Sequence, residues 1–566
     1  MKAPSQVSGP TSPPLRVDTI GQALEHAART WPRQEALVSV HQGIRLSYAE
    51  LNARADRIGA GLLALGLKRG DRVGIWSPNG VEWTLIQFAT AKAGMILVNI
   101  NPAYRGSELE YTLNKVQLSA LVAAEGDKSS DYAAMVEALL PEVAGHEGEL
   151  HAAAAPHLRH LVRIGGGLRA GWRPFEELES LATPGRLAEL SALGQSLGCH
   201  DPINIQFTSG TTGQPKGATL SHHNILNNGF FVGEAVGLRA GDRLCIPVPL
   251  YHCFGMVMGN LGCLTHGAAM VYPGATFDPV AVLQCIERER CTGIYGVPSM
   301  FIAELAHPRF RDFDLTSLRT GCMAGSPCPV DVMRRVIEAM HLRDVTIAYG
   351  MTETSPVSFQ TARDDDLERR VSTIGRIQPH LQCKVVDAGG RVVPRGTPGE
   401  LCTRGYAVML GYWDDQQKTA ETIDADGWLH TGDLVVLDPL GYGSVVGRLK
   451  DMVIRGGENI YLREIEEFLR THPAVRNASV VGVPDGELGE DLCAWIILRA
   501  GPAAQGVTPE AIRQFCQDRI AHYKVPRHIR FVTEFPMTVT GKIQKFEIRR
   551  RMMRQLGVSD ADGGVG

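Results

Sequence analysis

Hydrophobic and polar positions follow two different periods along most of this chain. Between residues 50 and 65 the apolar side chains recur at helical spacing, which predicts an amphipathic helix that Gly66 can close. Short β-rich runs separated by helical stretches predict strands at residues 72–76, 96–100, 120–124, 203–207, 244–248, 269–272, 293–297 and 345–349. Helices that alternate with strands in this way indicate an α/β architecture.

The pattern changes towards the C-terminus. From about residue 380 to 449 it becomes β-rich and is punctuated by glycine, which predicts a β-rich subdomain. Beyond residue 450, the segments 460–469, 475–483, 492–498 and 509–520 are expected to form helix, strand, strand and helix, a small domain of their own. Residues 1–17 begin with four prolines among fourteen residues and are expected to form a disordered tail.

Composition narrows the class of protein. A chain of 566 residues with 44% apolar and 21% charged residues is expected to fold into two or more globular domains. Lys plus Arg number 57 and Asp plus Glu 61, a net charge of −4 that argues against a nucleic-acid partner. No window approaches 18 consecutive apolar residues, so no transmembrane segment is expected, and no secretory leader is apparent.

The twelve cysteines stand singly, without a Cys-x-x-Cys pair. They are predicted to be reduced core thiols, which fits a cytoplasmic protein. A metal site on Cys322 and Cys328 has the wrong spacing and lacks a histidine cluster after it, so no zinc site is expected.

The stretch Thr208-Ser-Gly-Thr-Thr-Gly-Gln-Pro-Lys-Gly217 carries the first functional signal. Its glycines and proline prevent regular structure and let backbone N–H groups approach an anion, while hydroxyls and one lysine add donors and charge. A strand leads into it, and Ser221 can cap a helix after it, which favours a polyphosphate loop over a mobile surface turn. The residues expected to hold the phosphates are Thr208, Ser209, Gly210, Thr211, Thr212, Gly213 and Lys216. No Walker A string occurs in the chain.

A second motif, Tyr349-Gly-Met-Thr-Glu353, lies at the end of a predicted strand, where α/β sheets usually present ligands. Tyr349 could stack on a purine, with Gly350 beside it, and Thr352 could donate to a phosphate. Glu353 supplies a hard oxygen ligand for the Mg²⁺ that accompanies ATP. Taken alone, the motif would favour a strand end that exposes a glutamate.

Three more motifs follow in order: Trp428-Leu-His-Thr-Gly-Asp433, Gly447-Arg-Leu-Lys-Asp-Met-Val-Ile-Arg-Gly-Gly-Glu-Asn459 and Pro536-Met-Thr-Val-Thr-Gly-Lys-Ile-Gln-Lys545. With the phosphate loop they resemble the adenylate-forming superfamily of acyl-CoA synthetases, luciferases and peptide-synthetase adenylation domains. The resemblance extends from about residue 18 to about residue 551. It implies a large N-terminal AMP-binding domain over 18–449, built of mixed sheets sandwiched by helices, and a small, mobile α+β domain over 450–566.

The resemblance also assigns roles to individual residues. Asp433 matches the ligand of the ribose hydroxyls, and Arg448 a second nucleotide contact. Lys450 matches the hinge, and Lys542 the catalytic lysine, whose ammonium would stabilise charge around the α-phosphorus during adenylate formation. Gly456, Gly457 and Glu458 match the loop that enters the site for thioester formation. Since that loop and Lys542 cannot occupy one space together, rotation about the hinge would serve the two half-reactions in turn.

Two further stretches fit the resemblance. Pro249-Leu-Tyr-His-Cys-Phe-Gly255 is similar to the motif whose histidine, here His252, borders the acyl site, and Gly325 and Ser326 lie in a stretch similar to an adenine-contacting loop. An acyl tunnel is expected to be lined by His252, Phe254, Met256, Val297 and Pro298. As a packed loop residue His252 would have no such role.

The stretches 323–330 and 348–357 look most like the medium-chain fatty acyl-CoA synthetase branch. The implied reaction uses Mg·ATP to convert a carboxylic acid to acyl-AMP and pyrophosphate, and coenzyme A then accepts the acyl group with release of AMP. An aryl- or branched-acid CoA ligase, and a non-catalytic nucleotide- or acyl-binding relative, remain alternatives. The sequence leaves open whether the protein is a monomer or a homodimer.

Overall fold

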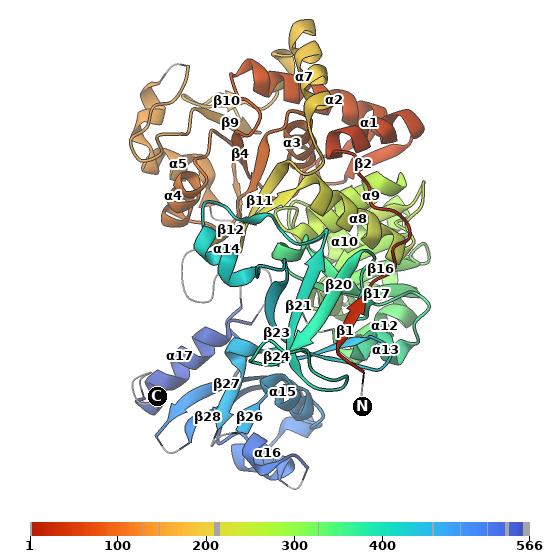
Figure 1. Ribbon diagram of the computed structural model, residues 1–566, viewed down its shortest axis with the longest axis vertical. Helices are drawn as coiled ribbons and strands as arrows, with labels where there is room; N and C mark the ends of the chain where they lie inside the picture. Colours follow the sequence, from red (N-terminus) through yellow and green to blue (C-terminus); the bar gives the residue numbers. More distant parts are fainter. Residues whose placement is uncertain are drawn as a thin grey trace. The chain divides into compact units, whose positions relative to one another are not determined.

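A computed structural model describes residues 3–127, 130–146, 148–208, 215–326, 328–455, 458–486, 488–517, 519–537 and 543–558, apart from the side chains of 127, 450, 454, 458 and 459 (Figure 1). The chain divides into two compact units. The larger unit comprises residues 7–383 and 403–429, and the smaller unit comprises residues 1–6, 384–402 and 430–566. Most of the predicted β-rich subdomain therefore groups with the C-terminal residues.

An eight-stranded sheet in the larger unit has the order β10-β9-β6-β4-β5-β11-β12-β22. Its strands are β4 (Arg72–Trp76), β5 (Ile96–Asn99), β6 (Ala120–Ala124), β9 (His160–Ile164), β10 (Arg173–Pro174), β11 (Pro202–Thr208), β12 (Lys216–Ser221) and β22 (Gly411–Tyr412). Successive residues of β4 enter different cores, because strand side chains alternate between faces: Val73 and Ile75 join one core, and Trp76 joins the other. The sheet is therefore covered on both faces, as parallel strands require.

A nine-stranded sheet in the same unit has the order β19-β18-β17-β16-β15-β13-β14-β2-β3. Its strands are β2 (Glu35–Ser39), β3 (Ile44–Ser47), β13 (Arg243–Cys245), β14 (Ala269–Tyr272), β15 (Gly293–Gly296), β16 (Thr320–Ala324), β17 (Asp344–Gly350), β18 (Val357–Gln360) and β19 (Arg376–Ile377). Met270 and Tyr272 face the core shared with the first sheet, whereas Val271 faces a third core. The predicted strands at 72–76, 120–124 and 269–272 are confirmed with their bounds, and the others within a few residues.

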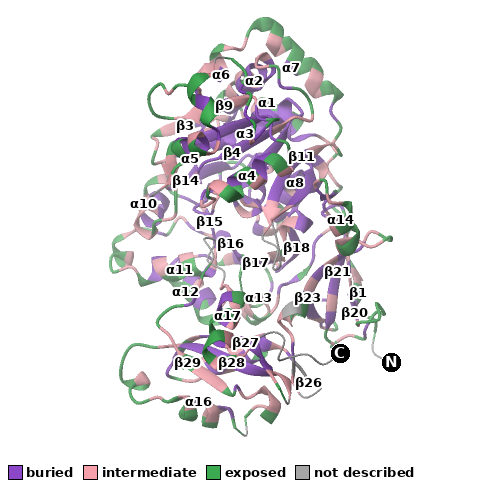
Figure 2. Ribbon diagram, turned by 90° about the vertical axis from the view of Figure 1, so that its left-hand side faces the viewer, coloured by how far each residue is buried: buried purple, intermediate pink, exposed green. Residues whose placement is uncertain are grey.

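Helices fill the space between the two sheets and cover their outer faces. The helices of this unit are α1 (Ile20–Thr30), α2 (Tyr48–Ala64), α3 (Val81–Lys92), α4 (Gly106–Lys115), α5 (Tyr132–Leu139), α6 (Glu177–Ser180), α7 (Pro184–Ser196), α8 (His222–Val236), α9 (Gly262–His266), α10 (Pro279–Glu289), α11 (Pro298–Ala306), α12 (Val330–Ala339), α13 (Leu367–Ser372) and α14 (Gln416–Thr422). Residues of α3 and α8 share one core with both sheets, and α3 is buried along its whole length (Figure 2). None of the helices in the described ranges is long and apolar enough to cross a membrane.

A further five-stranded sheet has the order β1-β20-β21-β23-β24, with strands β1 (Gln6–Ser8), β20 (Leu381–Val386), β21 (Gly399–Gly405), β23 (Leu429–Leu437) and β24 (Gly443–Arg448). The C-terminal part of the smaller unit has a sheet of order β26-β25-β28-β27, with β29 beside β28. Its elements are β25 (Val453–Arg455), β26 (Glu458–Ile460), α15 (Leu462–Arg470), β27 (Val475–Asp485), β28 (Gly489–Leu498), α16 (Pro509–Cys516), β29 (His528–Phe531) and α17 (Lys545–Leu556). Helix α15 packs in one core with this sheet and α17 in another, which gives the expected α+β composition (Figure 1).

The N-terminal segment is ordered from residue 3, although a disordered tail was expected over 1–17. Ser5 donates its N–H to Val393 O at 2.8 Å and accepts one from Val385 at the same distance. Farther along, Gly9 donates to Leu381 O at 2.8 Å. Prolines suit an edge strand because an edge needs few donors, so a proline-rich segment is compatible with this pairing.

Glu304 is an exception among the buried residues of α11. Its side chain is fully buried, and neither carboxyl oxygen has a hydrogen-bond partner among the described residues. It shares the inner face of the helix with Phe301. Burial raises the pKa of Glu304 well above its usual range, because the charged form would be buried away from water.

We expect Glu304→Met to raise the free energy of unfolding by about 1–3 kcal/mol, because an unsatisfied buried polar group is replaced by an apolar one of similar size. The gain should grow as pH rises above about 4.5, since the unfolded carboxyl ionises there while burial raises the pKa of the folded one. Urea unfolding between pH 4 and 8 measures this. Glu338→Met, the same change at an exposed position of α12, is the control, and a pH-independent difference between Glu304→Met and the native protein would contradict the interpretation.

Candidate functional site

Strands β11 and β12 form the antiparallel hairpin that carries the predicted phosphate loop. Thr208 and Lys216 are directly paired across it. Residues 209–214, with the predicted phosphate contacts Ser209, Gly210, Thr211, Thr212 and Gly213, lie outside the described residues. The helix after the hairpin, α8, begins as predicted: the Ser221 hydroxyl accepts the N–H of Asn224 at 3.1 Å.

Strand β17 ends at Gly350 and leads into a short 3₁₀ turn, Thr352–Thr354, that holds Glu353. Only glycine fits at 350, because a Cβ there would lie 1.7 Å from the carbonyl oxygen of Pro356. This close approach folds the chain back on itself after the strand, and Met351 donates its N–H to Pro356 O at 2.9 Å. The Glu353 side chain is 5% exposed rather than projecting into solvent, against the reading as an exposed strand end.

Glu353 is the point at which the predicted phosphate and magnesium residues meet. The Thr208 hydroxyl donates to Glu353 Oε1 at 3.3 Å. Tyr412, on β22 beside β12, donates its phenol to the same oxygen at 2.8 Å. The ammonium of Lys216 lies 4.8 Å from the centre of the Tyr412 ring. The structure thus brings Thr208, Lys216 and Glu353 together through a tyrosine that the sequence analysis did not identify.

The surroundings of Glu353 suit a carboxylate that binds a cation. Among the described residues its carboxylate takes part in no ion pair, and it accepts hydrogen bonds from two neutral hydroxyls. Burial and the neighbouring Glu353 carboxylate raise the pKa of Tyr412 far above its usual value, so the phenol stays a donor at neutral pH. Buried carboxylates are normally paired with a cation or coordinate a metal, and hard oxygen donors suit Mg²⁺. The residues present therefore fit the metal that accompanies a nucleotide triphosphate.

The predicted acyl residues lie around a π-helix, Phe254–Leu261. Met256 is buried, whereas His252 and Phe254 are half-buried, and the Phe254 ring lies 5.6 Å from that of Tyr295. Gly255 permits a close approach, because a Cβ there would lie 2.4 Å from the carbonyl oxygen of Pro249. A π-turn widens a helix and occurs often at functional sites, and here it presents the apolar residues named for the tunnel.

Buried amides on neighbouring strands hold the start of this π-helix. Asn99 donates to Tyr251 O at 3.0 Å and contacts Met256 Sδ at 3.2 Å. Gln206 contacts the same sulfur at 3.2 Å and accepts from the Cys253 thiol at 3.2 Å. Gln206 lies two residues before Thr208 on β11, so one strand contacts both the acyl and the phosphate parts of the site. The sequence analysis did not single out these amides, although amides inside an apolar strand are a readable signal.

The predicted acyl and adenine residues meet at the start of α11. Val297 precedes this helix and Pro298 is its first residue. Gly325 has φ of 88°, and a Cβ on it would lie 3.1 Å from Val297 Cγ1. Ser326 is exposed beside it. Of the other predicted nucleotide contacts, Gly350 is exposed, Thr352 is half-buried, and Tyr349 is half-buried with its ring 6.3 Å from that of Phe359.

In the smaller unit, Asp433 and Arg448 are paired across β23 and β24. Arg448 Nε lies 2.7 Å from Asp433 Oδ1, and the carboxylate is almost fully buried. A carboxylate has about four acceptor positions, so it can bind this guanidinium and a vicinal diol together. The structure therefore brings together the two residues for which the resemblance implies nucleotide contacts.

Glu400 supports this pair from β21 and was not identified from the sequence. Its Oε1 accepts the N–H of Gly432 at 3.1 Å, and its Oε2 lies 2.8 Å from His430 Nδ1. Gly432 has φ of 68°, and Asp433 donates its N–H to the Thr431 hydroxyl at 3.1 Å. The backbone immediately before Asp433 is thus fixed by a carboxylate on the neighbouring strand.

Several of the predicted site residues lie outside the described residues. These are Gly456, Gly457, Lys542 and the side chains of Lys450 and Glu458. The flanks of the segment with Lys542 are described: Met537 and Ile543 form an antiparallel bridge. Lys545, at the start of α17, lies 2.9 Å from Glu466.

Comparisons with known proteins agree with this arrangement. A family model described as AMP-binding enzyme matches residues 24–413, and one described as AMP-binding enzyme C-terminal domain matches residues 464–542. The mitochondrial medium-chain acyl-CoA ligase ACSF2 of Danio rerio is 48% identical, over 98% of this chain and 91% of the relative. ACSF2 of Homo sapiens is 44% identical over the same shares of the two chains.

Solved structures resemble the chain over nearly its whole length. The anthranilate CoA ligase AuaEII, in complex with anthranoyl-AMP, has a TM-score of 0.84 at 28% identity and covers 96% of this chain and 99% of its own. ATP-bound MatB from Rhodopseudomonas palustris has a TM-score of 0.79 at 28% identity, with 94% and 99% covered. The matches support the predicted order of an N-terminal nucleotide-binding part and a C-terminal domain.

Proposed function

This chain belongs to the AMP-binding, adenylate-forming enzyme family, and we propose that it is an AMP-forming ligase that joins medium-chain fatty acids to coenzyme A. The observation that carries the proposal is the meeting of Thr208 and Tyr412 at the buried Glu353 carboxylate, with Lys216 over the Tyr412 ring. Among the residues that the structure describes, this carboxylate forms no ion pair. The full-length identity to medium-chain acyl-CoA ligases supports the choice of acid.

In the first half-reaction, a carboxylate oxygen of the acid attacks the α-phosphorus of ATP. The bond to the β-phosphate breaks, and pyrophosphate leaves. Lys216 and the loop beginning at Thr208 would bind the phosphates, and Glu353 would hold Mg²⁺, whose charge offsets that of the triphosphate. Tyr412 and Thr208 orient the Glu353 carboxylate by hydrogen bonds to Oε1. Asp433 would accept both ribose hydroxyls while Arg448 holds the carboxylate in place.

Lys542 would enter this site for adenylate formation, where its ammonium stabilises charge on the carboxylate and phosphate oxygens. In the second half-reaction the thiolate of coenzyme A attacks the adenylate carbonyl, and AMP leaves with the bonding electrons. Rotation at Lys450 would exchange Lys542 for the loop with Gly456, Gly457 and Glu458, as the family resemblance implies. Domain alternation of this kind lets one pocket serve two transition states.

The acid would bind with its chain along His252, Phe254, Met256, Val297 and Pro298. Each methylene of the acid that is buried there stabilises the bound state by about 0.8 kcal/mol. The value of kcat/KM should therefore rise about fourfold per methylene until the tunnel is filled. We expect AMP release to increase from butyrate to octanoate or decanoate and to fall again for palmitate. A continuous rise to palmitate would move the assignment to long-chain acids.

An aryl-acid CoA ligase is the second candidate, because the anthranilate CoA ligase has a TM-score of 0.84. It ranks second because AuaEII is 28% identical to this chain, whereas the medium-chain acyl-CoA ligase of Danio rerio is 48% identical. Benzoate and anthranilate in the same assay separate the two: turnover of these acids above that of decanoate would favour the aryl assignment.

A reducing compartment, the cytoplasm, is part of the proposal. All twelve cysteines are free thiols in the fold, ten of them buried. Structural thiols of this kind persist where disulfides do not form. Immunolocalisation of the protein in its native cell tests the compartment, and recovery with an organelle or envelope fraction would contradict it.

Glu400→Ala is expected to raise the KM for ATP by about five- to tenfold, with a smaller change in kcat. The physical reason is that Gly432 N–H and His430 lose their acceptor, at a cost of about 1 kcal/mol or more, and Asp433 is then less well placed for ribose. Initial-rate kinetics with varied ATP measure the effect. Glu421→Ala, an exposed glutamate on α14, is the control, and an unchanged KM in Glu400→Ala would exclude the positioning role.

A further inference from the structure

A loop between α7 and β11 brings three metal-binding side chains together at the surface of the larger unit. Cys199 and His200 lie in the loop, and His223 is the second residue of α8. The N–H of His223 donates to Cys199 O at 2.7 Å, which fixes the loop against the start of the helix. One potential ligand atom from each of the three side chains lies within 4.8 Å of the other two.

Hydrogen bonds around His223 determine which ring nitrogen carries the proton. The Asn227 amide nitrogen lies 3.0 Å from Arg16 O, 2.9 Å from His223 O and 3.2 Å from His223 Nδ1. Its two protons suffice for the two carbonyl oxygens, which are the shorter contacts. Its own oxygen accepts from Arg16 N at 2.7 Å, so the amide orientation is fixed. His223 Nδ1, 3.2 Å from Arg16 O, must therefore be the donor to that carbonyl.

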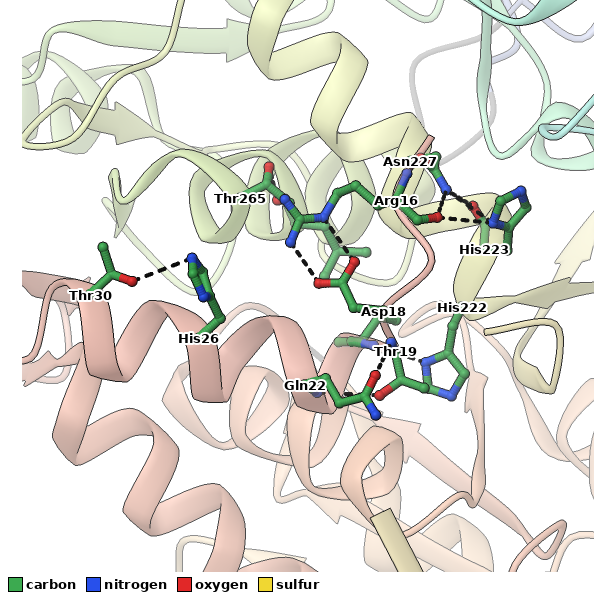
Figure 3. A network of polar contacts seen from close by, with 12 residues as sticks. Arg16, Asp18, Thr19, Gln22, His26, Thr30, His222, His223, Asn227 and Thr265 are labelled. Atoms are coloured by element: carbon green, nitrogen blue, oxygen red, sulfur yellow. Dashed lines mark hydrogen bonds and ion pairs between the residues drawn. The ribbon is translucent and has the colours of Figure 1, made fainter. Parts of the chain in front are cut away.

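Protonation at Nδ1 leaves the lone pair on Nε2 of His223. Figure 3 shows Nδ1 turned towards Arg16 and Asn227 and the other ring nitrogen directed away from them. A histidine that donates one ring N–H to a backbone carbonyl and offers the other nitrogen is the usual arrangement of a metal ligand.

The other two side chains are available. Among the described residues neither the Cys199 thiol nor the His200 ring has a hydrogen-bond partner. The His200 ring is exposed and lies 4.6 Å from that of His223, centre to centre. Tetrahedral zinc with bonds of about 2.0–2.3 Å places its ligand atoms about 3.3–3.6 Å apart. The three ligand atoms, now within 4.8 Å of one another, would therefore have to move closer together to bind zinc. Rotation of the exposed His200 side chain can bring its ring nitrogen nearer to the other two.

The start of α8 does not oppose a cation here. Its first N–H groups are already satisfied: His222 donates to Asp201 O at 3.3 Å, His223 to Cys199 O, and Asn224 to Ser221. Fewer free N–H groups mean a weaker positive end of the helix. A Cys199 thiolate would neutralise one charge of a divalent ion, which leaves a monocationic centre partly exposed to water.

From this geometry we propose that Cys199, His200 and His223 bind a zinc ion, with water as the fourth ligand. Thiolate and imidazole are both ligand types that zinc takes in proteins, and the exposed His200 gives the ion a route from solvent. Binding replaces the thiol S–H bond by a Zn–S bond and releases one proton to solvent. The sequence analysis expected no zinc site, and this cluster escaped it because His223 is 23 residues from His200 and joins it only in the fold. The site is independent of the proposed ligase activity.

Titration of the reduced full-length protein with Co²⁺, a spectroscopic substitute for zinc, tests the proposal. One equivalent should produce a thiolate-to-cobalt charge-transfer band and tetrahedral d–d bands, and Zn²⁺ should abolish both. Cys199→Ser should remove the charge-transfer band, and His200→Gln should weaken binding at least about tenfold. Cys328→Ser, the other half-buried cysteine, is the control and should bind as the native protein does.

The test must also exclude metal binding at a second thiol cluster, formed by Cys245, Cys285 and Cys291. Its three sulfur atoms also lie within 4.8 Å of one another. It is fully buried. Loss of the charge-transfer band in Cys285→Ala with retention in Cys199→Ser would assign the metal to that cluster and overturn the proposal. Absence of any band in the native protein, or full affinity in His200→Gln, would overturn it as well.

Discussion

Lys542→Ala is expected to slow formation of the acyl-adenylate by about 10²–10³-fold while formation of the thioester from supplied acyl-AMP is retained. The ammonium would act only where the carboxylate attacks the α-phosphorus, because that step concentrates negative charge on the phosphate and pyrophosphate oxygens. Pyrophosphate release measures the first half-reaction, and AMP release from synthetic acyl-AMP and coenzyme A measures the second.

A lysine three residues away provides the matched control. Lys545, the first residue of α17, forms an ion pair with Glu466 at 2.9 Å. We therefore expect it to stabilise the fold and not to contact the reacting atoms. Lys545→Ala should therefore affect the two half-reactions to the same small extent. Equal losses in both half-reactions for Lys542→Ala would contradict the role given to that lysine.

Glu353→Gln is expected to be the most damaging change among the described residues, with adenylation slowed by about 10²-fold or more and the Mg²⁺ requirement raised. Glutamine keeps an oxygen for the Thr208 and Tyr412 hydroxyls but has no charge to offer a cation. The fold should survive, since the hydrogen bonds are retained. Pyrophosphate release over a series of Mg²⁺ concentrations separates the loss of metal binding from other effects.

Tyr412→Phe tests the orientation of the Glu353 carboxylate separately from its charge. It removes one hydrogen bond to Glu353 and leaves the carboxylate charged, so we expect a loss of about tenfold or less. If Glu353→Gln showed the Mg²⁺ dependence of the native protein, or if Tyr412→Phe were the more damaging change, Glu353 would not be the metal ligand.

The sequence pattern predicted the strands well where burial alone determines which side chains fit. The apolar runs at 120–124 and 269–272 form buried parallel strands, for which burial on both faces allows only apolar side chains. The cap at Ser221 was also readable, because a hydroxyl at that position satisfies a free N–H of the first turn.

Features set by contacts between distant residues were not predicted. The tyrosine that orients Glu353 is 59 residues away in sequence, and strand pairing between β12 and β22 brings it there. The π-helix has the same apolar composition as an α-helix, and its extra width depends on Gly255 and on amides from two other strands. The ordering of residues 3–17 likewise depends on hydrogen bonds to distant residues, near 380–393 and at Asn227, which local composition does not reveal.

The candidate site was predictable to the extent that its residues stand in contiguous motifs. Thr208, Lys216, Glu353, Asp433 and Arg448 were all identified in this way, and the structure adds the groups that hold them. Glu400 and Gln206 were missed because each acts through a neighbouring strand rather than within a motif. Packing and strand order therefore supply the positioning residues, whereas motifs supply the groups that would meet the substrates.

The most direct test of the central proposal is AMP release by the purified protein with Mg·ATP, decanoate and coenzyme A, with the product identified by mass spectrometry. The proposal predicts decanoyl-CoA and AMP in equal amounts, and no sustained AMP release when either decanoate or coenzyme A is omitted. Absence of AMP and thioester with decanoate and every other acid of the series, from a folded protein that binds ATP, would contradict it.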